Sequence, residues 1–273
     1  KDNGGLGGAP KFPNEPVMRF LIDQKSPEAK EIIKLSFGKM LQGGLFDHIE
    51  GGFFRYCVDI DWSIPHYEKM LYNSAQLIEL YSLIYQSNKD KKINDSIYLT
   101  IRWLTEEMQS QEGGFFASMD ADSKNEQGDM EEGAYYNWSL EELKENLTPD
   151  EFLELFKWFY LDGEPNYEGK TWHLNLKIFD GVAKCKDIRE KLNTIRKART
   201  KPTTDKKIIT SWNALLIKSL LVAGDIFDEP QWIKLAQEAI DFIFNNLFRD
   251  EKLKSIYIDK KPLLNGYLDD YAF

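Results

Sequence analysis

Apolar residues recur every three to four positions along much of the chain, a pattern that predicts amphipathic helices. The clearest stretches are residues 26–44, 65–87, 93–108, 182–198, 209–227 and 231–248. Ser26-Pro27 at the start of the first stretch and Gly43-Gly44 at its end are typical helix boundaries. Shorter helices are expected behind the capping boxes that begin at Ser139 and Thr148. Residues 267–273 resemble the first turns of one more helix.

The connections between these helices contain two near copies of one Gly-rich motif. GGFFRY begins at Gly51 and GGFFAS at Gly113, and each copy leads into an acidic segment. Short β-hairpins are expected in these loops and at Lys252–Leu264. Helix pairs joined by such loops predict an all-α fold, an α/α toroid of the (α/α)₆ type whose rim carries the functional loops. A plain helical bundle is the alternative, although connections in bundles are usually shorter.

Composition narrows the range of partners. The formal net charge of −10 disfavours nucleic acid, because the protein's field repels phosphate. No apolar run approaches the roughly 20 residues of a membrane span, and Lys1–Pro10 show no signal peptide. The two cysteines, Cys57 and Cys185, are far apart and exclude a disulfide framework. We therefore expect a cytoplasmic setting, with neither a nucleic-acid nor a membrane partner.

Ionisable and aromatic side chains are most concentrated in residues 43–72, which hold two of the three histidines, His48 and His66. His66 and Glu68 are expected at a helix N-terminus. There the helix dipole lowers the pKa of a histidine, so that the neutral ring can accept a proton. The alternative is that both histidines are structural and bond to neighbouring carboxylates.

A second acidic segment begins at Asp120 and includes Asp122. Its D-x-D start resembles a calcium loop, but Lys124 and Asn125 stand where an EF-hand needs an oxygen ligand and a glycine. We therefore exclude an EF-hand. The segment continues to Trp138. We interpret its carboxylates and aromatic side chains as a rim that binds a polar ligand. A solvated acidic hairpin is the alternative.

Two later helix starts carry further candidates. Trp212 and Asn213 have the chemistry to stack on and hydrogen-bond a sugar, although core packing of the tryptophan is the alternative. Asp270 belongs to an acidic pair that could act in catalysis or only complement a helix dipole. The chain contains no P-loop, dinucleotide fingerprint, H-E-x-x-H or G-x-S-x-G motif. We expect no cofactor and no metal.

Six strings together resemble the thioredoxin-domain-containing proteins of the spermatogenesis-associated protein 20 type, in order and over essentially the whole chain. The strings are GGLGGAPKFP from Gly4, GGLFDHIEGGFFRYCVDIDWSIPHYEKMLY from Gly43, GGFFASMDADS from Gly113, EEGAYYNW from Glu131, RTKPTTDKKIITSWNALL from Arg199 and YLDDYAF from Tyr267. The resemblance implies a thioredoxin-like domain followed by a toroid similar to six-hairpin glycosidases and N-acylglucosamine 2-epimerases. Residues 1–273 are then expected to be a toroid fragment without the thioredoxin-like domain and the C-terminal hairpins.

By analogy of fold, the resemblance implies a carbohydrate-active domain. Hydrolysis would use Glu68 and Asp122, with Asp270 in reserve, whereas epimerisation would use His48 and His66 on opposite faces of a sugar carbon. The expected substrate contacts are Arg55, Trp62, Tyr72, Trp138, Trp212 and Asn213. The alternative is a non-catalytic domain that presents a client to the thioredoxin-like domain. The expected partners are thus a saccharide and that domain of the same protein.

Overall fold

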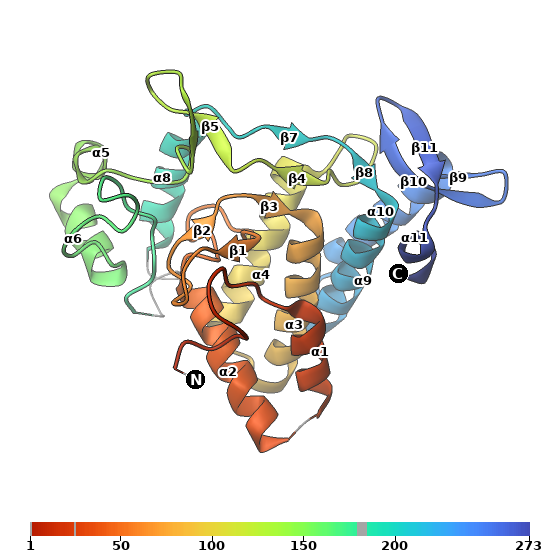
Figure 1. Ribbon diagram of the computed structural model, residues 1–273, viewed down its shortest axis with the longest axis horizontal. Helices are drawn as coiled ribbons and strands as arrows, with labels where there is room; N and C mark the ends of the chain where they lie inside the picture. Colours follow the sequence, from red (N-terminus) through yellow and green to blue (C-terminus); the bar gives the residue numbers. More distant parts are fainter. Residues whose placement is uncertain (1, 25, 179–184) are drawn as a thin grey trace.

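The computed structural model describes residues 2–24, 26–178 and 185–273 (Figure 1). The helices are α1 Glu15–Gln24, α2 Pro27–Gln42, α3 Leu71–Asn88, α4 Lys91–Trp103 with the π-helix η1 Leu104–Met108, α5 Leu140–Asn146, α6 Pro149–Trp158, α8 Lys186–Lys197, α9 Thr210–Phe227, α10 Pro230–Asn246 and α11 Leu268–Ala272. Helices dominate, and the strands between them are short and antiparallel.

The strands lie in the long connections. They are β1 Tyr56–Cys57, β2 Pro65–His66, β3 Lys69–Met70, β4 Ser118–Met119, β5 Asp122–Lys124, β6 Met130–Glu132, β7 Thr204–Asp205, β8 Ile208–Ile209, β9 Phe248–Arg249, β10 Lys252–Ile258 and β11 Lys261–Asn265. The hairpin expected at Lys252–Leu264 is β10 and β11.

Capping chemistry begins several of the helices where the sequence predicts. The Ser26 side chain accepts a hydrogen bond from the backbone of Ala29 at the start of α2. Thr148 and Glu151 form a complete capping box at the start of α6. Local sequence therefore sets these boundaries without help from distant parts of the chain.

Three pairs of helices pack side by side in an arc, and α5, α6 and α8 lie in the chain between the second and the third pair. The paired helices α1 and α2, α3 and α4, and α9 and α10 pack together. The first helix of each pair also contacts the first helix of the next, so α1, α3, α9 and α11 make one row (Figure 1). A row of inner helices backed by outer partners is the arrangement of an α/α toroid. The predicted fold class, a toroid type with short hairpins in the rim loops, is confirmed.

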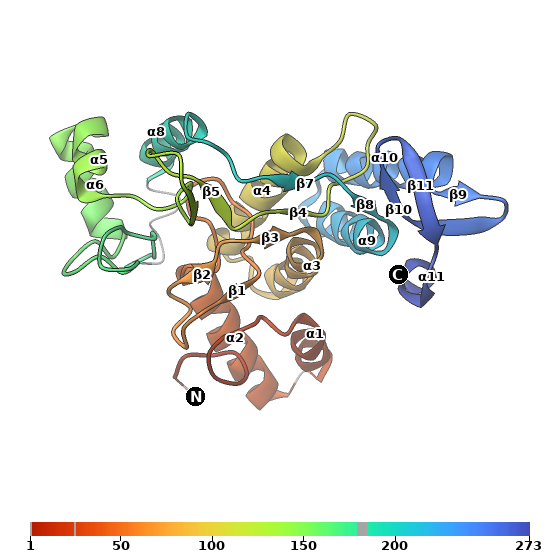
Figure 2. The same ribbon diagram turned by 45° about the horizontal axis from the view of Figure 1, so that its top comes forward.

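The two Gly-rich copies lead into the short strands β1 and β4 (Figure 2). Gly51 and Gly113 have φ angles of 95° and 101°, which disfavour a side chain. A Cβ on Gly51 would lie 2.5 Å from the carbonyl oxygen of Leu99 in α4, and one on Gly113 would lie 3.0 Å from that of Glu238 in α10. Each copy thus packs its glycine on the backbone of an outer helix. The segments that follow the two copies then meet, because β3 pairs with β4.

One expected helix needs correction, one helix was not predicted, and one expected helix lies partly outside the described residues. The helix predicted for residues 65–87 begins only at Leu71. Before it, Pro65–His66 pair as a strand with the nearby Tyr56–Cys57, and Lys69–Met70 pair with the distant Ser118–Met119. Helix α1 was not predicted. The start of the helix expected at residues 182–198 lies outside the described residues, and α8 covers the rest from Lys186.

The main hydrophobic core lies between the helix pairs and the rim loops. Its largest fully buried side chains include Trp62, Trp103, Trp138 and Trp172. Among the described residues, no helix combines the length and the apolar character needed to cross a membrane.

Candidate functional site

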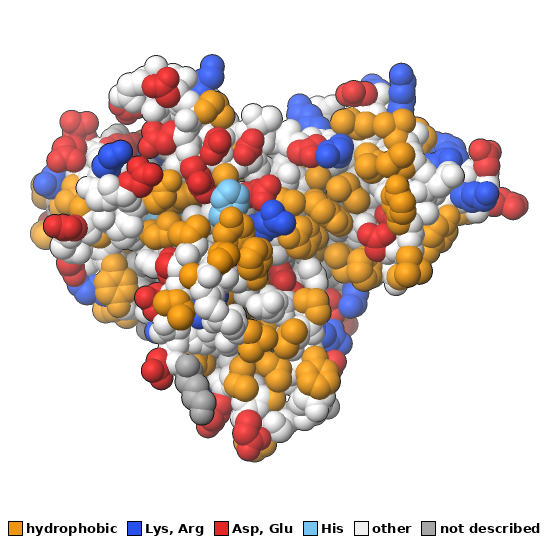
Figure 3. All heavy atoms as spheres, viewed as in Figure 1, with side chains coloured by type: hydrophobic (Ala, Val, Ile, Leu, Met, Phe, Trp, Pro, Cys, Tyr) orange, Lys and Arg blue, Asp and Glu red, His pale blue; other side chains and the backbone are white. Residues whose placement is uncertain are grey.

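One group of polar and aromatic side chains lies together on the rim and remains partly open to solvent. We call it the rim cluster, and it consists of Arg55, His66, Glu68, Tyr72, Glu132 and Trp212. Figure 3 shows histidine, acidic and basic side chains next to one another on this face of the molecule. Five of these six residues are among those that the sequence predicts for the site.

His66 is at the centre of the rim cluster. It lies in β2 opposite Tyr56 of β1, and the two rings stack with centroids 5.0 Å apart. Its Nδ1 lies 2.7 Å from a Glu132 carboxylate oxygen, and its Nε2 lies 3.9 Å from Glu68. A carboxylate on one ring nitrogen orients the imidazole and leaves the other nitrogen for proton transfer. The side chain is 28% exposed, so a ligand can reach it.

Arg55 links the charged half of the cluster to its aromatic half. Its guanidinium donates to Glu68 at 3.1 Å and to the Tyr72 hydroxyl at 3.2 Å. The bond to Tyr72 is the main reason that the pKa of Arg55 is raised. The centroid of the Tyr72 ring lies 4.9 Å from that of the Trp212 ring in α9. Both rings are partly exposed, so they can face a ligand that Arg55 also reaches.

Glu132 was not predicted as a site residue. Its position in the rim cluster follows from its pairing with Asp122 in a hairpin. Asp122 in β5 lies opposite Glu132 in β6, so one hairpin carries both acids to the rim. Tyr167 supports this hairpin by donating a hydrogen bond to the Glu132 carbonyl at 3.1 Å. Within the described chain, the Asp122 carboxylate has no ion-pair partner. The available sequence signal was the place of Glu132 in the acidic segment that begins at Asp120, and the register of the hairpin puts both acids on one face.

The helix-dipole explanation for His66 and Glu68 is wrong, because α3 begins at Leu71 and both residues precede it. His48 also differs from the expectation. It is only 2% exposed, and its Nε2 bonds to the Gly43 carbonyl at 2.9 Å. Burial lowers the pKa of His48 to about 4. His48 and His66 therefore do not form a pair that faces a common ligand.

Trp62 and Trp138 do not offer the stacking surfaces expected of them, because both are fully buried. The Trp62 indole donates to the Asn3 carbonyl at 3.0 Å and has Lys11 above its ring. The guanidinium of Arg199 covers the Trp138 ring at 4.1 Å. Their large apolar area packs the core beneath the rim.

Asn213 and Asp270 also serve the scaffold. Asn213 is fully buried, and its amide bonds to the backbone N–H and carbonyl of Phe115 at 2.8 and 3.0 Å. It thus ties the second Gly-rich loop to α9. The Asp270 carboxylate accepts hydrogen bonds from the backbone of Ser211 and Tyr267, which caps two helix starts.

A buried ion cluster lies beneath the first Gly-rich loop. It consists of Asp47, Glu50, Lys69 and Arg196, all at most 3% exposed. Arg196 donates two hydrogen bonds to the Asp47 carboxylate, at 2.8 and 3.1 Å, and Lys69 donates a third, at 2.8 Å, to Oδ2 of Asp47. Lys69 also donates to the Gly51 carbonyl at 2.7 Å. The formal charges of the four residues sum to zero.

Aromatic rings enclose this ion cluster. The Lys69 ammonium lies 4.7 Å from the Trp103 ring and about as close to Phe54 and Tyr136. Burial alone would raise the pKa of Asp47, but Arg196 and Lys69 hold it well below its ordinary value. Neither Lys69 nor Arg196 was predicted to have a role. Their partners are distant in sequence, so no local motif reveals the cluster.

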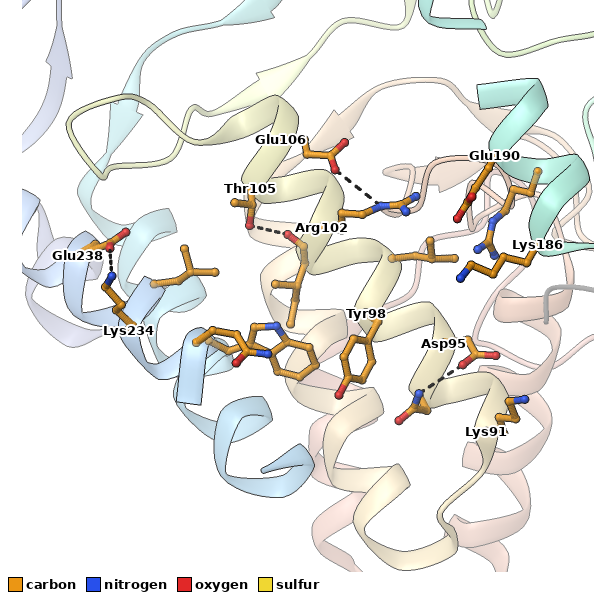
Figure 4. A pocket seen from close by; sticks show the side chains of 17 residues that line it. Lys91, Asp95, Tyr98, Arg102, Thr105, Glu106, Lys186, Glu190, Lys234 and Glu238 are labelled. Atoms are coloured by element: carbon orange, nitrogen blue, oxygen red, sulfur yellow. Dashed lines mark hydrogen bonds and ion pairs between the residues drawn. The ribbon is translucent and has the colours of Figure 1, made fainter. Parts of the chain in front are cut away.

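The groove in Figure 4 is a separate feature. It has a volume of about 860 Å³ and lies between α4, α8 and α10. Arg102 pairs with Glu106, and Lys234 pairs with Glu238, in each case four residues further along the chain. None of the residues that the sequence predicts for the site lines this groove. Among the described residues, no group of three His, Cys, Asp or Glu side chains is arranged to hold a metal ion.

Solved structures of carbohydrate enzymes resemble the chain at low sequence identity. A family 76 glycoside hydrolase from a bovine Bacteroides thetaiotaomicron strain is 11% identical with a TM-score of 0.49, over 85% of this chain and 34% of that one. A sugar epimerase from a ruminal bacterium is 13% identical with a TM-score of 0.39, over 96% and 87%.

Two curated proteins are similar over nearly the whole chain. Spermatogenesis-associated protein 20 of Homo sapiens is 28% identical over 100% of this chain and 41% of its own length. An uncharacterized protein of Caenorhabditis elegans is 31% identical over 99% of this chain and 44% of its own length. The chain thus spans less than half of these relatives. No family model matches it. The resemblance carried by the sequence motifs is confirmed, since the chain is homologous along its whole length to part of the proteins named spermatogenesis-associated protein 20.

Proposed function

We propose that the rim cluster binds a saccharide and that His66 transfers a proton to and from it. The observation that carries the proposal is the position of the His66 ring. Glu132 holds one nitrogen at 2.7 Å, and the other nitrogen lies beyond hydrogen-bond distance of Glu68, at 3.9 Å. An oriented imidazole with one nitrogen available is suited to general acid and base chemistry near neutral pH.

The surroundings of His66 suit a polyhydroxylated ligand. Arg55 donates hydrogen bonds, Glu68 and Glu132 accept them, and Tyr72 and Trp212 offer aromatic surface. The relatives and similar folds add only analogy, and the activity of the whole protein remains part of the proposal.

The reaction class proposed is proton transfer next to a carbonyl, as in sugar epimerisation. His66 removes, through its Nε2, a proton from the carbon adjacent to the carbonyl of the open-chain sugar. The electron pair of that C–H bond moves into an enediolate, whose charge Arg55 stabilises. The protonated His66 then gives a proton back to the same carbon of the planar enediolate and the carbonyl re-forms, so that no other reactant is consumed.

Hydrolysis by Glu68 and Asp122 is the second candidate. It is favoured by the Asp122 carboxylate, which has no ion-pair partner in the described chain and lies on the hairpin that carries Glu132. It is disfavoured by the Arg55 pair, because Arg55 lies 3.1 Å from a Glu68 carboxylate oxygen and occupies it.

A non-catalytic domain that presents a client to a thioredoxin-like domain is the third candidate. The same rim would recognise a saccharide or peptide without reacting with it. Localisation in the cytoplasm and pairing with a thioredoxin-like domain belong to this proposal too.

The test is hydrogen exchange in D₂O. The chain is incubated with a panel of reducing mono- and disaccharides, and NMR follows deuterium entering at the carbon next to the carbonyl. We expect exchange with at least one sugar, and a loss of about 10²-fold or more in His66→Gln, the usual scale for one acid-base group. Glu132→Gln should reduce the rate less, because it only orients the ring.

Two outcomes count against the proposal. Cleavage of a glycoside without exchange would favour Glu68 and Asp122. Binding without exchange or cleavage, unchanged in His66→Gln, would favour a non-catalytic domain.

A further inference from the structure

A separate pocket shares no residue with the rim cluster or with the groove in Figure 4. Helices α1, α2 and α3 and the start of α4 line it, in the lower part of Figure 1, and its volume is about 650 Å³. Small-molecule sites have volumes of roughly 300–1,000 Å³. The Tyr81 hydroxyl donates to the Phe37 carbonyl at 2.9 Å, and the centroids of the two rings lie 4.8 Å apart. These contacts fix α3 against α2, and we call the space the Gly38 pocket.

Gly38 lies inside α2 and lines this pocket. Glycine is among the least favourable residues in a helix interior, so such a position usually has a backbone or packing reason. Gly38 has neither. Its φ angle is not positive, and a Cβ built on it would meet no atom of the described residues within 4 Å beyond its own stretch of helix. The chain therefore gives up helix stability at a position where a side chain would occupy the pocket.

The wall of the Gly38 pocket is mainly apolar, and part of it remains open to solvent. Ile22 of α1 and Leu83 and Ile84 of α3 line the pocket and are only half-buried. Ile33 and Phe37 of α2 also line it and belong to the main hydrophobic core. An aliphatic group that covers the half-buried side chains removes apolar surface from water, which favours binding. A sugar ring, whose edge consists of hydroxyl groups, covers this wall less well.

The unpaired charges beside this apolar wall are positive. Lys30 and Lys34 line the pocket one turn apart on α2, and neither forms an ion pair with another described residue. The acids that line it already have partners, because Asp23 pairs with Arg19 at 3.3 Å and Asp90 accepts a hydrogen bond from the backbone at the start of α4. Like charges one turn apart weaken a helix, and an anion beside them offsets that effect. The wall and Gly38 define the site, and the two lysines set the sign of its head group.

We propose that the Gly38 pocket binds an aliphatic carboxylate of the medium-chain fatty acid class, with its tail on the apolar wall and its carboxylate at Lys30 and Lys34. The space beside Gly38 admits the tail. The two lysines repel a cation with the same tail, and a short anion such as acetate cannot cover the wall. The pocket lies at the end of α3, whereas Tyr72 of the rim cluster lies at its start, so this inference does not depend on proton transfer at His66.

The test is calorimetric titration of the protein with sodium decanoate, below the concentration at which decanoate forms micelles. Acetate lacks the tail and decyltrimethylammonium reverses the charge, so these two are the comparisons. We expect one decanoate per protein, no binding of acetate, and binding of decyltrimethylammonium that is weaker by about tenfold. The double variant Lys30→Gln with Lys34→Gln should weaken decanoate binding about fivefold, the scale of an exposed ion pair. Lys39→Gln is its control, because Lys39 is also in α2 but does not line the pocket, and it should leave binding unchanged.

Gly38→Leu is the sharpest variant, because its side chain enters the open space of the pocket and leucine favours the helix. It should abolish decanoate binding and keep or raise the melting temperature. Gly38→Ala is the matched control. It also favours the helix but adds a single methyl group, so it should weaken binding less.

Four results would each overturn the inference: no binding of decanoate, equal binding of decyltrimethylammonium, several decanoates bound per protein, or binding that a folded Gly38→Leu variant leaves unchanged. If Gly38→Leu does not fold, Leu83→Gln tests the same wall, because Leu83 is half-buried and lines the pocket. Weaker decanoate binding in Leu83→Gln would support the inference, and unchanged binding would overturn it.

Discussion

The buried ion cluster and the rim cluster come from the same stretch of sequence but have opposite surroundings. Asp47 and Lys69 are sealed in the core with Arg196. His66 and Glu68, from the same stretch, are 28% and 24% exposed. A high density of ionisable residues was interpreted as one functional segment, and the structure divides it into a scaffold and a candidate site.

The difference between the two clusters is how completely each charge is matched. In the buried cluster, Asp47 accepts hydrogen bonds from Lys69, Arg196 and the backbone of Ile49. Such a group has no capacity left for a ligand. In the rim cluster, one nitrogen of His66 has no close partner. Incomplete pairing at a solvent-accessible position is therefore a better guide to function than the density of charge.

The largest effect is expected for Asp47→Asn. The substitution leaves two buried cations facing Glu50 alone, and breaking a buried ion network typically costs about 3–5 kcal/mol of stability. Urea denaturation should show this as a lower midpoint with an unchanged slope. Asp162→Asn is the control, because its pair with Lys177 is exposed and should contribute less than about 1 kcal/mol. A loss below about 1 kcal/mol in Asp47→Asn would mean that the buried cluster is not needed for the fold.

The next effect is a loss of stability in acid. Burial lowers the pKa of His48 to about 4 and that of His173 to about 3. In the unfolded chain both titrate near their ordinary value of about 6.5. Below that pH the unfolded state binds more protons than the folded state, so acid favours unfolding. Melting temperature should fall steadily from about pH 7 to pH 4. A flat profile over this range would show that the two rings are not buried in the neutral form.

A smaller effect is expected for Asn213→Ala, which belongs to the scaffold. It removes the amide that satisfies the backbone of Phe115 and the carbonyl of Ile209. Leaving such buried groups unpaired costs about 1–3 kcal/mol. The denaturation midpoint should fall, while deuterium exchange at the rim is retained in the folded fraction. If Asn213→Ala is as stable as the parent but no longer catalyses deuterium exchange, Asn213 belongs to the binding site and not to the scaffold.

Local sequence was sufficient for much of the fold. Periodicity and capping located α2, α9 and α10, and the repeated Gly-rich motif marked two loops that lead into short strands. Local sequence was misleading at residues 65–70, where the spacing of apolar residues suggested a helix. Pairing with Tyr56 and with Ser118-Met119 makes strands there, because tertiary contacts override a weak local preference.

The site was only partly predictable for the same reason. His66, Glu68 and Arg55 were found because they are close in sequence. Glu132 lies 66 residues from the His66 it orients, and Arg196 lies 149 residues from the Asp47 it neutralises. Which acids are exposed and which are sealed depends on these distant partners. A single sequence therefore shows where charged residues are concentrated but not which of them are buried and which remain exposed.

The smallest effect on stability is expected for Glu68→Gln and Asp122→Asn. Glu68 pairs with Arg55, but the two side chains are 24% and 40% exposed, and solvent screens such a pair. Arg55 also keeps its bond to Tyr72. Both variants should thus stay within about 0.5 kcal/mol of the parent in urea denaturation.

Activity, by contrast, should respond to these two changes. If His66 carries the proton transfer, Glu68→Gln should alter the exchange rate more than Asp122→Asn, since the Glu68 carboxylate lies 3.9 Å from the open nitrogen of His66. Equal and complete loss in both variants would support the two-carboxylate mechanism instead. A fall of several degrees in the melting temperature of both variants would show that the rim charges stabilise the fold, as Asp47 does, and are not available to bind a ligand.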